Sequence, residues 1–76
     1  MEIGNIIKQK RFKASMTQEQ LAEKLGISPQ SVSKWENEIS MPDIALLPEI
    51  AEVFGVSVDE LFGLNENEKL RRIATI

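Results

Sequence analysis

The chain has 76 residues, a net charge of −3, no cysteine and no histidine. A chain of this length builds one small core, and the two missing residue types exclude disulfides, thiolate or imidazole metal sites and histidine acid–base catalysis. No apolar run approaches the roughly 20 residues that cross a membrane, and the N-terminus lacks the apolar core of a signal peptide. We therefore expect a cytoplasmic protein that is not an enzyme and needs neither a cofactor nor a small-molecule ligand.

The charge is unevenly distributed along the chain. Residues 1–40 carry six basic side chains and five acids, whereas residues 41–76 carry three basic side chains and seven acids. The two parts therefore have net charges of about +1 and −4. This asymmetry permits a nucleic-acid-facing N-terminal half, although an acidic C-terminal half is equally typical of a solvated surface.

The first predicted helix covers residues 2–14. Apolar side chains recur there at helical spacing, opposite the basic residues, at Ile3, Ile6, Ile7 and Ala14. Met16 follows and is expected to enter the core. The pattern is typical of an amphipathic helix that packs one face against the rest of the domain.

A second and a third helix follow in close succession. TQEQ at residues 17–20 is a capping box that starts the second helix, and Gly26 supplies the left-handed residue that ends it. Ser28 then caps a helix that begins at Pro29, where the missing N–H of proline costs nothing, and that ends near Asn37. The predicted inward residues are Leu21, Ala22 and Leu25 in the second helix and Val32 and Trp35 in the third.

Two shorter helices come next. ISMPD at residues 39–43 is typical of a loop, and an irregular turn is expected at 43–47 because Pro48 would disrupt a helix interior. The fourth helix then covers 48–54 and stops at Gly55. SVDE at 57–60 is a second capping box that opens a fifth helix, which Gly63 closes. The inward residues are Ile50, Ala51 and Phe54 in the fourth helix and Val58, Leu61 and Phe62 in the fifth.

Two short helices joined by GIS match a helix-turn-helix, whose second helix enters the major groove of DNA. By itself this pattern is weak, because helix pairs are common in small bundles. However, MTQEQLAEKLGISPQSVSKWENE followed by LPEIAEVFGVSVDELFG resembles the DNA-binding domain of lambda-type repressors, Cro proteins and XRE-family regulators, over residues 3–63. The resemblance implies an all-α, five-helix lambda-repressor-like fold and a homodimer that binds double-stranded DNA in transcription.

The resemblance also assigns roles to individual residues of the third helix. The positions from which the family reaches base edges are Pro29, Gln30, Ser33 and Lys34. Gln30 can bind adenine in a bidentate manner and Lys34 can reach guanine or a phosphate, whereas Pro29 offers only apolar contact. The residues expected to contact phosphate are Lys10, Thr17, Gln18, Ser28, Asn37 and Ser40. The competing interpretation is that these are ordinary surface or capping residues.

Two further sets of residues follow from the same resemblance. Arg11 and Glu36 match an ion pair between the first and third helices, which fixes helix orientation more than it adds stability. The expected dimer contacts are Val56, Ser57, Val58, Leu61 and Leu64. We expect the domain to cover residues 1–64. The tail, residues 65–76, can form a short sixth helix for dimerisation, remain an unstructured terminus or serve as a linker to a further domain.

The sequence leaves three functions open. The first is a dimeric repressor that reads a palindromic operator through the helix at 28–37. The second is an antitoxin that binds DNA and also a toxin partner. The third is a protein-interaction module that has kept the fold and lost DNA binding, which the acidic loop EISMPD and the net acidity would suit.

Overall fold

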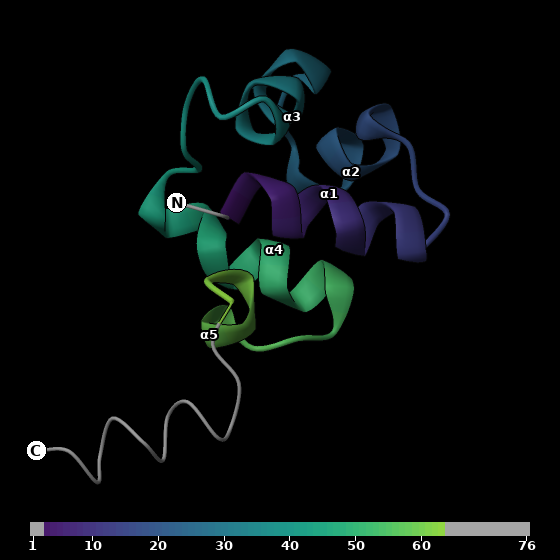
Figure 1. The fold of residues 1–76 in the computed structure, drawn as a ribbon. Helices are drawn as coiled ribbons and strands as arrows, with labels where there is room; N and C mark the ends of the chain where they lie inside the picture. The colour runs from purple at the N-terminus through teal and green to yellow at the C-terminus, as the bar shows by residue number, and fades with distance from the viewer. Residues whose placement is uncertain (1–2, 64–76) are drawn as a thin grey trace, which may run out of the picture.

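The computed structural model describes residues 3–63, which are drawn in colour in Figure 1. In chain order the elements are α1 (Ile3–Lys13), α2 (Gln18–Leu25), α3 (Pro29–Glu36), the 3₁₀ turn η1 (Ile44–Leu46), α4 (Leu47–Phe54) and α5 (Val58–Leu61). These residues form helices and no strand, so the predicted all-α fold is confirmed. The tail, with its predicted sixth helix, lies outside the described residues.

Helix α1 lies between two pairs of helices. Figure 1 shows α2 and α3 on one side of α1 and α4 and α5 on the other, and α1 contacts both α3 and α5. The side chains at the centre of this arrangement are fully buried: Ile7, Leu21, Val32, Ile50 and Leu61. Each comes from a different helix, so one shared core holds the five helices together.

The caps of α2 and α3 are those that the sequence predicts. Thr17 Oγ1 accepts from the Gln20 N–H at 3.0 Å, and Gln20 Oε1 accepts from the Thr17 N–H at 2.8 Å, which completes the capping box. Gly26 ends α2 in the left-handed conformation with φ of 70°. Ser28 Oγ caps α3 by accepting from the Ser31 N–H at 3.3 Å, and Pro29 is the first residue of that helix. The tight turn between the two helices is therefore encoded locally.

The end of α1 differs from the prediction. Ala14 was expected on the inner face, but α1 ends at Lys13 and Ala14 is exposed in the following turn. Ser15 adopts φ of 52°, and the Met16 N–H donates to the Arg11 carbonyl at 3.0 Å. The chain thus leaves the helix through a left-handed serine. Because the usual sequence signal for such an end is glycine, the sequence did not predict this boundary. Met16 packs half-buried against the core, close to its predicted place.

The C-terminal pair also departs from the prediction in detail. The irregular turn before Pro48 is the 3₁₀ turn η1, and α4 starts at Leu47, so that Pro48 falls in the first turn where helices accept it. Phe54, Val58 and Phe62 were expected on the inner faces; they are half-buried and pack against the core. Ser57 caps α5 by accepting from the Glu60 N–H at 3.2 Å, while the Glu60 carboxylate lies 4.0 Å from Lys10 Nζ.

Candidate nucleic-acid interface

The inner face of α3 is fixed to α1 by a buried ion pair. Arg11 Nε and Nη2 donate to the two carboxylate oxygens of Glu36, each at 2.8 Å. Arg11 Nη1 also donates to the Met16 carbonyl at 2.9 Å, and Gln18 Nε2 donates to Glu36 Oε1 at 3.1 Å. Only 2% of the Glu36 side chain is exposed. One carboxylate therefore joins the end of α1, the first turn of α2 and the last turn of α3.

This network changes how Glu36 titrates. Burial alone would raise the pKa of Glu36, but the hydrogen bonds from Arg11 and Gln18 and the positive charges of Arg11 and Lys8 outweigh burial and hold that pKa below its ordinary value. The hydrogen bond to Glu36 keeps the pKa of Arg11 above its ordinary value despite burial. Both groups are therefore charged at neutral pH, and each satisfies the other in a site that water barely reaches.

A second contact brings α1 and α3 together at the other end of α1. A Cβ atom added to Gly4 would overlap the carbonyl oxygen of Trp35 and lie 2.9 Å from its carbonyl carbon. Only glycine leaves room for this approach of the two backbones. The role of Gly4 could not be predicted from the sequence, because a glycine inside a helical pattern gives no sign of the element that it faces.

The outer face of α3 carries three of the four predicted base-reading residues in exposed positions. Pro29, Gln30 and Lys34 are exposed, whereas Ser33 is half-buried. Asn37 caps the helix, and its Nδ2 donates to the Ser33 carbonyl at 2.9 Å and lies 3.3 Å from Ser33 Oγ. The Asn37 amide therefore already serves its own helix, so any phosphate contact would have to share it.

The first turns of α2 and α3 share one shallow depression. Its lining, which encloses about 640 Å³, includes the predicted phosphate-contacting residues Thr17 and Gln18 together with Pro29. Arg11 and Phe12 line the same depression, and the Arg11 guanidinium lies 4.6 Å from the centre of the Phe12 ring. Ser28, also predicted to contact phosphate, is exposed at the start of α3. The first turns of two helices thus stand beside the predicted base-reading face.

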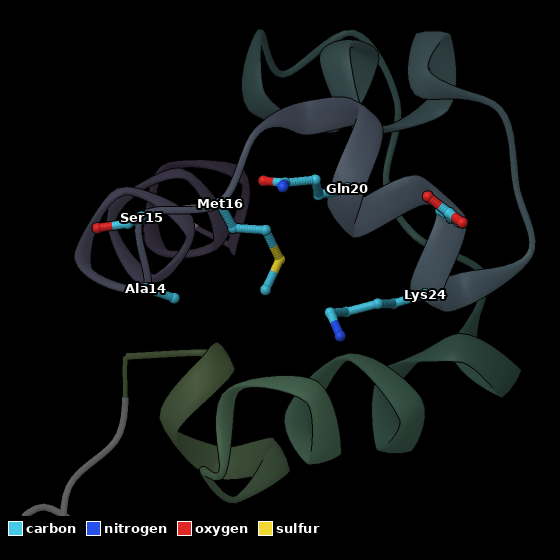
Figure 2. Close-up of a pocket in the computed structure, with 6 residues that line it drawn as sticks. Ala14, Ser15, Met16, Gln20 and Lys24 are labelled. Atoms are coloured by element: carbon cyan, nitrogen blue, oxygen red, sulfur yellow. The ribbon is translucent and has the colours of Figure 1, made fainter.

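Two basic residues lie away from this face. Lys10, a predicted phosphate contact, lies beside Glu60 of α5. Lys24 borders a depression that Glu49 and Glu52 of α4 also line, and Figure 2 shows its side chain extending from α2 toward the C-terminal helices. By contrast, Lys8 lies on the α3 side of α1, 5.9 Å from the centre of the Phe12 ring, and its charge acts on Glu36. Lys8 is therefore better placed than Lys10 to approach a phosphate.

The loop that follows α3 carries the last predicted phosphate contact. Ser40 is exposed, and its N–H donates to the Lys34 carbonyl at 3.4 Å. Glu38 adopts φ of 60°, which turns the chain sharply away from the helix axis. Ser40 therefore lies close to the end of α3, and it lines the same hollow as the acidic residue Glu38.

Comparison with known proteins shows to which family this chain belongs. The model of the helix-turn-helix family matches residues 7–61, a stretch that includes α2, the GIS turn and α3. The chain belongs to the XRE-type helix-turn-helix family. The resemblance inferred from the sequence is thereby confirmed.

Relatives of this helix-turn-helix domain include regulators from bacteria. The chain is 39% identical over 66 residues to the HTH-type transcriptional activator BcrR of Enterococcus faecalis, and the match covers 87% of this chain and 32% of BcrR. It is 36% identical over 69 residues to the HTH-type transcriptional regulator ImmR of Bacillus subtilis, covering 91% of this chain and 54% of ImmR. The chain thus spans about a third to a half of the length of these two relatives.

A solved structure has the same helix arrangement. The crystal structure of apo-HppE superimposes with a TM-score of 0.69 and 33% sequence identity, covering 78% of this chain and 33% of the HppE chain. The similarity is therefore to one part of a longer protein. In the helix-turn-helix domain itself, no helix within residues 3–63 is long and apolar enough to cross a membrane.

The predicted dimer contacts of the domain differ in how available they are. Val56 and Val58 are half-buried and Ser57 is exposed, so each of the three keeps some surface that a second copy could contact. Leu61 is fully buried in the core and offers no surface to a second copy in this conformation. Leu64 lies outside the described residues. The dimer surface predicted from the sequence is thus reduced to the turn that leads into α5.

Proposed function

We propose that this domain binds double-stranded DNA in a sequence-specific manner and regulates transcription, as a dimeric repressor. The observation that carries the proposal is the division of α3 into a fixed inner face and an exposed polar outer face. The bacterial relatives support the role in transcription, because BcrR and ImmR are named as a transcriptional activator and a transcriptional regulator. This function would place the chain in the cytoplasm, with the DNA.

In this proposal α3 enters the major groove, which is about 12 Å wide and admits one helix. Gln30 would read an adenine through its amide, and Lys34 would reach a guanine or a phosphate. Pro29 would offer an apolar edge, and Ser33, being half-buried, would contribute less. Gln30 is therefore the side chain on which sequence discrimination depends most.

The phosphate contacts would come from the helix N-termini and the loop that surround α3. Thr17 and Ser28 are the N-caps of α2 and α3 and Gln18 is the first residue of α2, so their polar side chains and the first backbone N–H groups of α2 would approach one strand of the duplex. Asn37 and Ser40, at the far end of α3, would approach the backbone across the groove. We add Lys8 to this set and rank it before Lys10, because Lys10 lies beside Glu60.

A dimer would present two copies of α3 to successive major grooves. Two-fold related half-sites lie about 34 Å apart, one turn of B-DNA, and the operator should be palindromic for this reason. The contact between copies would involve the turn at Val56, Ser57 and Val58. With few basic residues near α3, one copy alone would bind weakly, so the second copy would supply much of the affinity.

The test is selection of bound duplexes from a random pool at moderate salt. The proposal predicts a short palindromic motif whose half-sites are one helical turn apart, with affinity that falls as salt rises. A motif without symmetry would contradict the dimer. Failure to enrich any sequence at low or moderate salt would contradict DNA binding and favour a protein-interaction module.

A further inference from the structure

The loop after α3 exposes an unusual number of large apolar side chains. Ile39 is 72% exposed, Met41 is 53% exposed and Ile44 is 80% exposed, and within residues 3–63 only Phe12 is comparable. Isolated apolar side chains are normal on protein surfaces, whereas three within six residues are a candidate contact surface. This surface lies on the loop that adjoins the end of α3 and therefore borders the candidate nucleic-acid interface.

Part of this surface is concave. Ile39 and Met41 line a hollow of about 250 Å³ together with Ile3 and Trp35, at the place where α1 and α3 approach at Gly4. We call it the loop hollow. Glu38 and Ser40 also line it, and at its base the backbones of α1 and α3 meet without an intervening side chain at Gly4. An apolar side chain from an occupant would find a preformed seat.

The charges around the loop hollow define what can occupy it. The segment 35–48 contains three acids and neither lysine nor arginine. Glu36 is paired with Arg11, but Glu38 and Asp43 are exposed on either side of the apolar residues. A phosphate backbone would be repelled here. The complementary occupant carries apolar side chains next to lysine or arginine.

The chain itself contains a segment of this chemistry. Residues 69–76 read KLRRIATI and combine three basic side chains, Lys69, Arg71 and Arg72, with three large apolar ones, Leu70, Ile73 and Ile76. No other segment of the C-terminal part, residues 41–76, carries a lysine or an arginine.

This segment is within reach of the loop hollow. A Cβ added to Gly63, where the described chain ends, would lie 3.4 Å from Ile6 Cδ1, and Ile6 is three residues from Ile3 on α1. Three residues of helix advance by about 4.5 Å. The five residues 64–68 can span up to about 17 Å when extended, compared with about 4.5 Å along α1 from Ile6 to Ile3, which lines the hollow.

We propose that residues 69–76 dock on the loop hollow of their own chain, with apolar side chains against Ile39 and Met41 and the two arginines beside Glu38 and Asp43. A segment tethered by five residues has a high effective concentration at its own hollow, which favours the same chain over a second copy. Docking would also neutralise the acids that flank Ser40. The tail would thereby reduce the repulsion between this loop and a nearby phosphate backbone.

The experiment measures the proximity of the tail to the loop in the full chain. The chain has no cysteine, so Thr75→Cys gives one attachment point for a nitroxide. In ¹⁵N-labelled protein carrying this nitroxide, the amide signals of residues 38–41 should broaden. The broadening should survive Arg71→Lys/Arg72→Lys and should fall sharply in Arg71→Glu/Arg72→Glu. Lys24→Glu, a reversal on α2, is the matched control and should leave it unchanged.

Variants on the receiving side test the same contact. Ile39→Ser/Met41→Ser changes only exposed side chains, so the fold should persist while the broadening decreases. Signals at 38–41 that stay sharp in the nitroxide-labelled chain would overturn the proposal, as would broadening that the Glu substitutions leave unchanged. Broadening that appears only when a ¹⁵N-labelled chain is mixed with a separate nitroxide-labelled chain would assign the contact to a second copy and would also overturn it.

Discussion

The two faces of α3 are built from different interactions. On the inner face, Val32 and Trp35 are buried and Glu36 accepts three hydrogen bonds from α1 and α2. On the outer face, Gln30 and Lys34 are exposed and form no side-chain hydrogen bond or ion pair with any residue in 3–63. The inner face therefore determines where α3 lies, and the outer face keeps its hydrogen-bonding groups free for another molecule.

The largest effect should come from Gly4→Ala, which acts on the inner face alone. The added methyl group would overlap the Trp35 carbonyl, so α1 and α3 must separate. Overpacking of this kind typically costs about 1 to 3 kcal/mol of unfolding free energy, and more where backbone must move, as it must here. Urea denaturation measures the loss, with the exposed Asn5→Ala on the same helix as control. A loss for Gly4→Ala no larger than the control's would mean that the two helices do not meet at this point.

A loss of similar size should follow removal of one member of the ion pair. Arg11→Met leaves the Glu36 carboxylate buried without its main partner, which costs about 3 kcal/mol. The double variant Arg11→Met/Glu36→Leu removes both charges and should recover much of this stability. If the double variant were less stable than Arg11→Met, the cost would not come from an uncompensated buried charge.

The Arg11–Glu36 pair also predicts how the free energy of unfolding changes at acidic pH. The pKa of Glu36 is lower in the folded chain than in the unfolded chain, so its contribution is fully present above the ordinary value of about 4.3 and disappears as pH falls toward the folded pKa. Denaturation between pH 3 and pH 7 should show this loss in the wild type and a shallower one in Arg11→Met/Glu36→Leu. Parallel profiles for the two proteins would contradict the assignment.

A smaller effect is expected on the outer face from Lys34→Ala. Removing one cation from the interface should reduce the slope of log K against log salt concentration by about 1. Lys24→Ala is the control, because Lys24 points toward α4. Duplex binding measured over a range of salt concentrations tests both. Equal slopes for Lys34→Ala and wild type would place Lys34 outside the interface.

The smallest effect concerns the end of α1. Ser15 occupies a left-handed conformation, so Ser15→Gly should relieve strain and stabilise the chain by about 0.5 kcal/mol. Gln9→Gly, in the exposed middle of the same helix, should instead cost about 1 kcal/mol. Thermal unfolding of the two variants should therefore change in opposite directions. Two losses would mean that Ser15 is not strained in solution.

Much of the fold could be predicted because its signals are local. The TQEQ capping box, Gly26 and the Ser28–Pro29 pair each fix a helix boundary within a few residues, and the structure places all three boundaries there. The end of α1 could not be predicted, because Ser15 adopts a left-handed conformation that serine rarely shows. Phe54 was expected in the core, but how deeply it is buried depends on tertiary packing, which periodicity does not encode.

The candidate site could be predicted only where the family pattern reaches it. Gln30 and Lys34 were expected on the exposed face of α3 and lie there. Gly4 was missed, because the need for glycine there depends on how closely α1 approaches α3. Phe12 was missed, because the depression that it lines is completed by the first turn of α2. Lys10 stays a predicted phosphate contact, and its closeness to Glu60 of α5 became apparent only from the structure.

The central claim is that the outer face of α3 reads sequence while the inner face holds the helix in place. The most direct measurement compares the binding of wild type and Gln30→Ala to the selected duplex and to every single-base-pair variant of one half-site. We predict that Gln30→Ala loses about 1 to 3 kcal/mol on the selected duplex, with stability unchanged, and loses discrimination at one base pair only. An equal loss on every duplex, with discrimination retained at all positions, would contradict the claim.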